Sequence, residues 1–377
     1  MSTIKNHINT YATTTAYDND LNKDYPNVSY IEEDDIVLFE KINYAQEYFA
    51  IESLEDNNTI MFRLFSERPG ASSAKTISVS TDDGKTWANY TSTTGGATIA
   101  TLNNGEKVLI KGNNSAYADT YGYNYFHTTR QFDVSGNIMS LIYGDNFKEK
   151  YSLPYGGYNF QNLLYQNTGL VNAENLVLPA KTLAKSCYSY MFSGCTSLVN
   201  APELPATTLA DSCYINMFQN TNVLPDTSNI DFTSQTVVAS GGLIGLFGGT
   251  KVTDADLMRI LPKNSNNKYC LPATTLANYC YSYMFNNCKN LTTAPELPAT
   301  TLVKYCYQYM FYNCTNIKYI KAMFTTRPSG SSPNYYTENW VKGVSATGTF
   351  VKNSAASWNV TGANGIPTGW TIQNASS

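Results

Sequence analysis

The stretch Leu271-Pro-Ala-Thr-Thr-Leu276, followed by Cys280-Tyr-Ser-Tyr-Met-Phe285, is repeated almost unchanged further along the chain. The second copy reads Leu297-Pro-Ala-Thr-Thr-Leu302 and then Cys306-Tyr-Gln-Tyr-Met-Phe311, so that Leu271 and Leu297 are 26 residues apart. A fixed period of this size is typical of a solenoid, in which each unit can bury its apolar face only against its neighbours.

An earlier pair of copies has the same period, with Leu178-Pro-Ala-Lys-Thr-Leu183 and Leu204-Pro-Ala-Thr-Thr-Leu209 at their starts. Within a unit, residues 183–192 are expected to form a short helix or 3₁₀ turn, and Leu198–Ala201 a short strand that ends where Pro202 bends the chain. The positions expected to form the core of the repeats are Leu183, Cys187, Phe192, Cys195, Leu198, Leu276, Cys280, Phe285, Cys288, Leu291, Leu302, Cys306, Phe311 and Cys314.

The spacing between the two pairs is irregular, since 67 residues separate Leu204 from Leu271. We interpret residues 222–270 as one degenerate unit enlarged by loops, with Leu246-Phe247 as a weakened Met-Phe corner. Within it, Thr253 is expected to be the N-cap of a helix that runs to Leu261.

Composition narrows the class of protein. The chain has 377 residues, a net charge of −4 and only 14% charged residues, but it has 30 tyrosines. Basic residues are not clustered, so no nucleic acid or anionic membrane partner is expected. No apolar run is long enough to cross a bilayer. The fold class expected is mixed and mostly β, and low charge in a β-rich chain favours an extracellular or virion protein.

Four segments are expected. Residues 1–46 are polar and contain two short strands around the acidic run Glu32–Asp35, so they are either a floppy terminus or an anchoring arm that orders on a partner. Residues 47–158 predict a β-sandwich, 159–325 the repeats, and 326–377 a C-terminal β cap. Strands of the sandwich are expected at 59–65, 76–80, 97–102, 107–111, 123–126, 131–134 and 138–142.

The β-domain contains Ser80-Thr-Asp82-Asp-Gly84-Lys-Thr86-Trp87, which matches the Asp-box and resembles the hairpin turns of sialidase propellers. Sialidases carry several copies together with an arginine cluster, whereas this chain has a single copy and few arginines. A structural hairpin is therefore favoured over a catalytic domain, with Asp82 bonding to turn amides and Gly84 supplying a positive φ.

The run Leu-x(3)-Cys-Tyr-x-x-Met-Phe-x-x-Cys-x-x-Leu, as in 276–291, resembles the BspA-type leucine-rich repeat, with Met284 where that family has alanine. The whole layout also resembles virion proteins of crAss-like phages that infect Bacteroides, in which such modules decorate head or tail fibres. These resemblances imply a leucine-rich-repeat solenoid with a strand cap around residues 339–372. They also imply a virion structural protein.

The cysteines could form disulfides, bind zinc or be buried free thiols. Cys187/Cys195, Cys280/Cys288 and Cys306/Cys314 are eight residues apart, but Thr221 stands where Cys213 would need a partner. A disulfide framework would not leave one unit half bridged, and zinc sites need closer cysteine spacing. We therefore expect buried free thiols, which also fit a protein made in the host cytoplasm.

No catalytic constellation is visible. His7 and His127 are the only histidines, and there is neither a phosphate-binding loop nor a dinucleotide fingerprint. We expect a protein that is not an enzyme and that binds no metal or cofactor.

Tyrosine pairs recur in the repeats: Tyr188 with Tyr190, Tyr281 with Tyr283, and Tyr307 with Tyr309. The two members of a pair lie two residues apart on a short turn, so they cannot all face inward. Either half are core and the rest are scattered over the surface, or they form a surface that binds sugar rings or another protein.

Three classes of function are weighed: a phage virion structural protein, which includes head and tail fibres, a bacterial surface adhesin and a sialidase-like enzyme. Within the first class the favoured function is a phage head fibre whose N-terminal segment docks on the capsid and whose repeats project outward, as a homodimer or homotrimer, toward host glycans or proteins. A tail receptor-binding fibre protein is the nearest alternative. A BspA-type bacterial surface adhesin would need an export signal, which Met1–Thr10 does not resemble. A sialidase-like enzyme would need further Asp-boxes.

Overall fold

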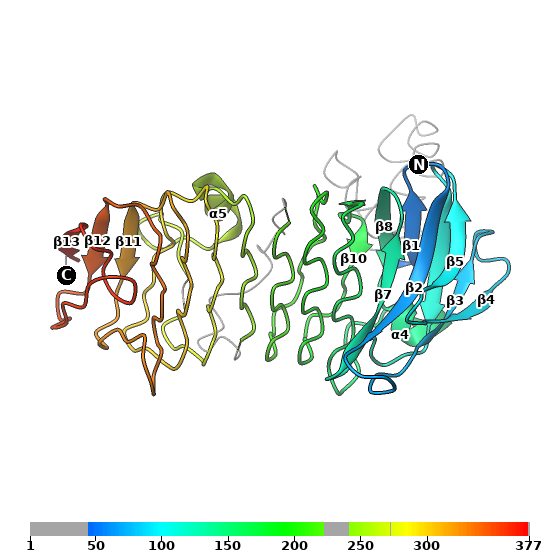
Figure 1. The fold of residues 1–377 in the computed structure, drawn as a ribbon, viewed down its shortest axis with the longest axis horizontal. Helices are drawn as coiled ribbons and strands as arrows, with labels where there is room; N and C mark the ends of the chain where they lie inside the picture. Colours follow the sequence, from blue (N-terminus) through cyan, green and yellow to red (C-terminus); the bar gives the residue numbers. More distant parts are fainter. Residues whose placement is uncertain (1–43, 222–240, 272, 376–377) are drawn as a thin grey trace, which may run out of the picture.

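The computed structural model describes residues 44–221, 241–271 and 273–375. The chain is mostly β, with several sheets, none of them closed. It forms an elongated body in which strands β1 (Phe49–Ser53) and β13 (Thr371–Asn374) lie toward opposite ends (Figure 1). Most of the N-terminal segment expected at 1–46, including its two strands, lies outside the described residues.

Two sheets form the β-domain at the N-terminal end. The first has the order β10-β8-β1-β6-β3-β4, with β9 also paired to β8, and the second has the order β5-β2-β7. The two sheets meet through aromatic side chains: the ring centroid of Phe126 on β7 lies 5.5 Å from that of Phe49 on β1 and 5.1 Å from that of Phe62 on β2. The strands not yet given are β2 (Asn58–Ser66), β3 (Thr76–Ser80), β4 (Ala88–Thr91), β5 (Ala97–Leu102), β6 (Lys107–Gly112), β7 (Gly122–Thr128) and β8 (Phe132–Asn137).

Most expected strands of this domain are present, but residues 138–142 were wrongly expected to form one. They run into helix α4 (Ser140–Tyr143), which is followed by the 3₁₀ helix η1 (Gly144–Asn146). A short, fully apolar run has no period that separates a strand from a buried helix. Here Ser140 selects the helix, because its hydroxyl donates to the Ile110 carbonyl and accepts from the Phe49 amide. Strands β1 and β4 were not expected: β4 is an exposed edge strand without alternation, whereas β1 is a buried strand between β8 and β6.

The chain beyond Asn159 winds into successive coils that lie side by side (Figure 1). Each coil contains a nine-residue segment, here called a rung, with alternate amides that donate to carbonyls of the next rung. Tyr188 N donates to Cys213 O at 3.0 Å, and Phe192 N donates to Met217 O at 3.0 Å. The rungs are residues 158–166, 186–194, 212–220, 241–249, 279–287, 305–313 and 335–343.

The expected helix or 3₁₀ turn within each unit is wrong. Every fourth residue of a rung has a positive φ, as in Ser186 (53°), Tyr190 (57°) and Gly194 (78°). Left-handed residues at this spacing interrupt any helix and turn every second amide toward the neighbouring coil. The expected strand Leu198–Ala201 is also absent: Asn200 makes a single bridge to Asn172.

The coils continue directly from the β-domain and beyond the expected boundary at residue 325. Phe126 N on β7 donates to Leu163 O of the first rung, and β8 pairs in parallel with β9 (Leu170–Asn172) and β10 (Leu176–Val177). The last rung is 335–343. A parallel sheet of β11 (Tyr319–Ala322), β12 (Thr349–Lys352) and β13 closes the C-terminal end.

The middle of the body carries helix α5 (Asp254–Ile260), whose N-cap is Thr253 as expected. The Thr253 hydroxyl accepts from the Asp256 amide, and the Asp256 carboxylate accepts from the Thr253 amide, which completes a capping box. The rung at 241–249 precedes it, and Leu246-Phe247 occupies the positions that Met-Phe holds elsewhere. The part of the degenerate unit at 222–240 lies outside the described residues.

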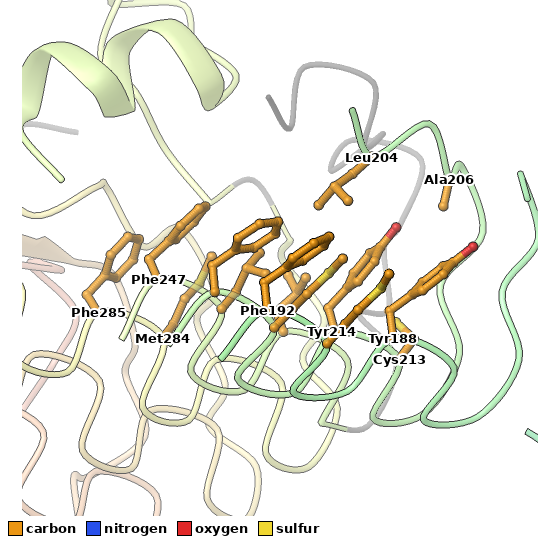
Figure 2. Close-up of a cluster of buried hydrophobic side chains, with 14 of the residues drawn as sticks. Tyr188, Phe192, Leu204, Ala206, Cys213, Tyr214, Phe247, Met284 and Phe285 are labelled. Carbon is orange, nitrogen blue, oxygen red and sulfur yellow. The ribbon is translucent and has the colours of Figure 1, made fainter. Parts of the chain in front are cut away.

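One continuous apolar core runs through both regions, from Phe49 to Trp370. Inside the coils, equivalent side chains lie in rows, as Figure 2 shows for Tyr188 and Tyr214 and for Phe192, Phe247 and Phe285. The ring centroids of Phe192 and Phe218 are 5.2 Å apart. All side chains that the sequence assigns to the repeat core are buried. Stacking them buries the face that a single coil would leave in water.

Candidate functional site: the outer tyrosine rows

Tyrosines with positive φ form two rows along the outside of the last three rungs. The first tyrosine row is Tyr279, Tyr305 and Tyr335, with ring centroids 4.4 Å and 5.3 Å apart. The second tyrosine row is Tyr283 and Tyr309, 4.7 Å apart. These separations match the spacing of hydrogen-bonded neighbouring chains, so identical residues on successive rungs stack face to face.

In each predicted tyrosine pair, one tyrosine is buried in the core and the other lies on the outer side. Tyr188, Tyr281 and Tyr307 were wrongly included among the surface-binding candidates, because each is only 1% exposed and lies in the apolar core. They stand two residues after the first left-handed residue of their rung, a position that points inward. Their partners Tyr190, Tyr283 and Tyr309 have positive φ and lie on the outer side.

The first tyrosine row was missed by the sequence reasoning. A signal for two of its members was present, since Tyr279-Cys280 and Tyr305-Cys306 repeat with the 26-residue period. Tyr335 has no such signal, because Tyr336 replaces the following cysteine. Tyrosine is an unusual choice at positive φ, and the face-to-face stacking compensates for part of the backbone cost.

The rows are electrically neutral. Partial burial raises the pKa of Tyr279, with Tyr305 as the next cause, and burial followed by Tyr309 and Glu338 raises the pKa of Tyr283. Polar neighbours fix the second tyrosine row: Asn339 Nδ2 donates to the Tyr309 hydroxyl at 3.0 Å, and this hydroxyl donates to the Glu338 carboxylate at 3.5 Å. Lys304 Nζ lies 5.0 Å from the centroid of the Tyr305 ring, which places one cation beside the first row.

Both rows stop at the rung 241–249. Gly241 and Gly245 hold the positions equivalent to Tyr279 and Tyr283, so no ring from that rung covers the two tyrosines. Neutral polar side chains of the rung 212–220 extend toward the two glycines instead. Ser212 Oγ is 3.4 Å from where a Cβ on Gly241 would lie, and the side-chain oxygen of Asn216 fills the place of a Cβ on Gly245.

The cysteines belong to the interior of the coils. All eight are free and buried, as the sequence predicts. Cys195, Cys288 and Cys314 each donate across the gap to a carbonyl of the preceding rung, at Sγ–O distances of 3.2, 3.0 and 2.9 Å. In the units of the rungs 212–220 and 241–249, Thr221 and Thr250 stand where the other units have this cysteine, and their hydroxyls donate to carbonyls of their own rung. A threonine can thus replace the second cysteine of a unit, and Cys213 needs no second cysteine beside it.

The Asp-box is a closed structural turn. The Asp82 carboxylate accepts from the Thr86 amide at 2.9 Å and from the Ser80 hydroxyl at 2.7 Å, and these bonds lower the pKa of Asp82 to about 2. Trp87 packs edge-on against Tyr48, with Lys111 Nζ 4.0 Å from its ring centroid. The motif therefore fastens the hairpin to the start of β1.

The rest of the described structure contains an open cleft but no cluster of metal-ligating side chains. An open cleft of about 650 Å³ in the β-domain is lined by Glu52, Asp83, Glu106 and Lys107 among other residues. Nowhere in the described ranges do three or more His, Cys, Asp or Glu side chains come together as metal ligands would. Of the helices that the structure describes, none has the length and apolarity to cross a bilayer.

Comparison with known proteins finds no matching family model, no matching curated protein and no matching solved structure.

Proposed function

We propose that this chain is a structural protein of a phage virion, namely a head fibre that decorates the capsid. In this proposal residues 1–46 dock on capsid or other virion proteins, and the coils form a BspA-type leucine-rich-repeat solenoid that projects outward. The outer tyrosine rows contact host glycans or proteins. The proposal assigns no catalysis, cofactor, nucleic acid or membrane to the chain, and it places the protein on the particle surface as a homodimer or homotrimer after synthesis in the host cytoplasm.

The observation that supports it best is the uninterrupted connection along the body. Backbone hydrogen bonds join each rung to the next from Leu163 to Trp340, and a single core runs the same length. Each rung contacts only its neighbours, so such a stack acts as a spacer whose length follows from the number of units. A spacer with neutral aromatic rows on its outer side suits adhesion better than turnover of a substrate.

The decisive experiment is localisation on intact particles. Antibodies raised against purified protein should label the capsid in immunogold electron microscopy. Label at the tail tip would favour the tail receptor-binding fibre, and label on bacterial cells without phage would favour the adhesin. Absence of label from particles would exclude both virion assignments.

The docking role of the N-terminal segment is tested by truncation. The deletion should end at residue 43 and not at 46, because Ala45 O accepts from Asn137 Nδ2 and Tyr44 O accepts from Glu47 N. The truncated protein should melt like the full chain but be missing from particles. If it stays on particles, the anchor lies elsewhere in the chain.

A further inference from the structure

The two tyrosine rows begin at the same rung, next to a rung that has no side chains at the equivalent positions. Within a row, ring faces are covered by the next ring at 4.4 to 5.3 Å. Tyr279 and Tyr283 begin the rows, and the preceding rung offers only glycine at the equivalent positions. Their side chains are 38% and 37% exposed, whereas the following members are half-buried. Two neighbouring aromatic faces are therefore turned toward the glycine rung.

The groups that extend toward these faces from the rung 212–220 are polar and uncharged, and the charge that acts on Tyr283 is the carboxylate of Glu338. Ser212 and Asn216 extend over Gly241 and Gly245 from the other side of that rung. The hydroxyl and the amide can donate and accept hydrogen bonds, and neither carries charge. The nearest cation of the first row, Lys304, lies over Tyr305, one rung away from the open faces. Among the described residues no Lys or Arg lies over the ring of Tyr279 or Tyr283, so these faces offer no cation–π partner that would favour an anionic ligand.

From this arrangement we propose that the open faces of Tyr279 and Tyr283 bind a neutral saccharide. The C–H face of a pyranose ring stacks on a tyrosine, while Ser212 and Asn216 bond to its hydroxyls. Tyr305, which has a ring on each side, presents only its edge. Tyr279 and Tyr283 each have a face next to Ser212 and Asn216, which supply the hydrogen-bonding groups that a sugar needs. The inference rests on the adhesive role proposed above and names the class of ligand.

The test uses the full chain in native gels that contain dextran, mannan or xylan as neutral polymers, with polygalacturonate as the charged comparison. At least one neutral polymer should retard the protein. Retardation should be lost in the double variant Tyr279→Ala/Tyr283→Ala. The variant Tyr335→Ala, at the far end of the first row, should keep it. Thermal melting of each variant shows whether it is folded.

A second variant adds a side chain and removes none, so loss of sugar binding in it could not be caused by the loss of a packed ring. Gly241 has φ 67°, close to 60° at Tyr279 and 61° at Tyr305, so Gly241→Tyr should extend the first row and cover the open face. The new Cβ meets only the movable ends of the Ile244 and Ser212 side chains, at 3.1 and 3.4 Å. This variant should stay folded and lose retardation.

Three results would overturn the proposal: no retardation by any of the three neutral polymers, retardation by polygalacturonate alone, or full retardation of the folded Gly241→Tyr variant. Each result leaves the virion assignment intact if the protein still labels particles. Failure of the immunogold experiment with sugar binding retained would reject the virion assignment alone.

Discussion

The ring of Tyr188 stacks on the ring of Phe160 with centroids 5.8 Å apart, and the two residues hold equivalent positions on neighbouring rungs. Tyr188 nevertheless carries a buried hydroxyl without a hydrogen-bond partner, and so does Tyr281. Burial raises the pKa of both phenols far above the ordinary value. A buried unpaired hydroxyl costs free energy, so Tyr188→Phe should raise the free energy of unfolding by about 1 kcal/mol.

The measurement is chemical denaturation of the variant and the parent. Tyr117→Phe is a matched control, because the Tyr117 hydroxyl donates to the Leu141 carbonyl at 2.9 Å. That control should lose about 1 kcal/mol. A loss of stability in Tyr188→Phe would show that its hydroxyl has a partner, such as a bound water.

The buried thiols should be unreactive in the native protein. Burial raises the pKa of Cys195 and Cys288 to about 12, so their reactive thiolate forms are scarce at neutral pH. Iodoacetamide should label none of the eight cysteines in the folded chain and all eight after denaturation without reductant. Mass spectrometry counts the labels. A count lowered by two in the denatured sample would reveal a disulfide.

Asp133 should make stability depend on pH. Burial, with Glu52 and Glu174 as further causes, raises the pKa of Asp133 from 3.8 to about 6, and Asn172 opposes the shift with a backbone hydrogen bond. The folded state therefore binds this proton more tightly than the unfolded state. The stabilisation is complete below pH 3.8 and is lost as the pH rises through 6.

Asp133→Asn removes the charge, so it should raise the melting temperature at pH 8 and change it little at pH 4. Thermal melts of both proteins across this range provide the measurement. Glu174→Gln, which removes one neighbouring charge, should have a smaller effect of the same sign. Melting curves of Asp133→Asn and the parent that stay a constant distance apart would contradict the assignment.

The positive φ of Asn313 predicts that glycine at this position is less destabilising than alanine. Its φ is 57°, and Gly194 and Gly249 hold the equivalent position in other rungs. Asn313→Ala should destabilise the protein by about 1 kcal/mol, because alanine tolerates this conformation poorly. Asn313→Gly should be close to neutral. Urea denaturation distinguishes the two variants, and equal losses would mean that the asparagine side chain itself matters.

The sequence predicted the parts that repeat or alternate. The core positions of the repeats could be assigned because the 26-residue period places the same apolar residue at the same place in each coil. The path of the backbone could not be predicted, because the period does not say whether Cys187–Phe192 is helical. The left-handed residues Ser186 and Tyr190 are not types that signal positive φ, and only the neighbouring rung explains them.

The candidate site could be predicted only in part, because the repeat period shows which tyrosines recur but not which of them face outward. A spacing of two shows that Tyr281 and Tyr283 point in different directions, but it does not say which is outside. Tyr335 lies after a 30-residue interval from Tyr305, so its membership of the first row depends on a coil that the period does not predict. The end of the rows at Gly241 was also not visible, since only the fold aligns that glycine with Tyr279.

Successive rungs begin 28, 26, 29, 38, 26 and 30 residues apart, whereas every rung itself has its left-handed residues at the same two intervals of four. Length variation is thus confined to the return segments between rungs. An added residue there enlarges a loop, but one added inside a rung would shift every later amide out of phase with its acceptor. Such proteins can therefore lengthen or diversify by changing their return segments, while single-residue insertions inside a rung should be lethal to the fold.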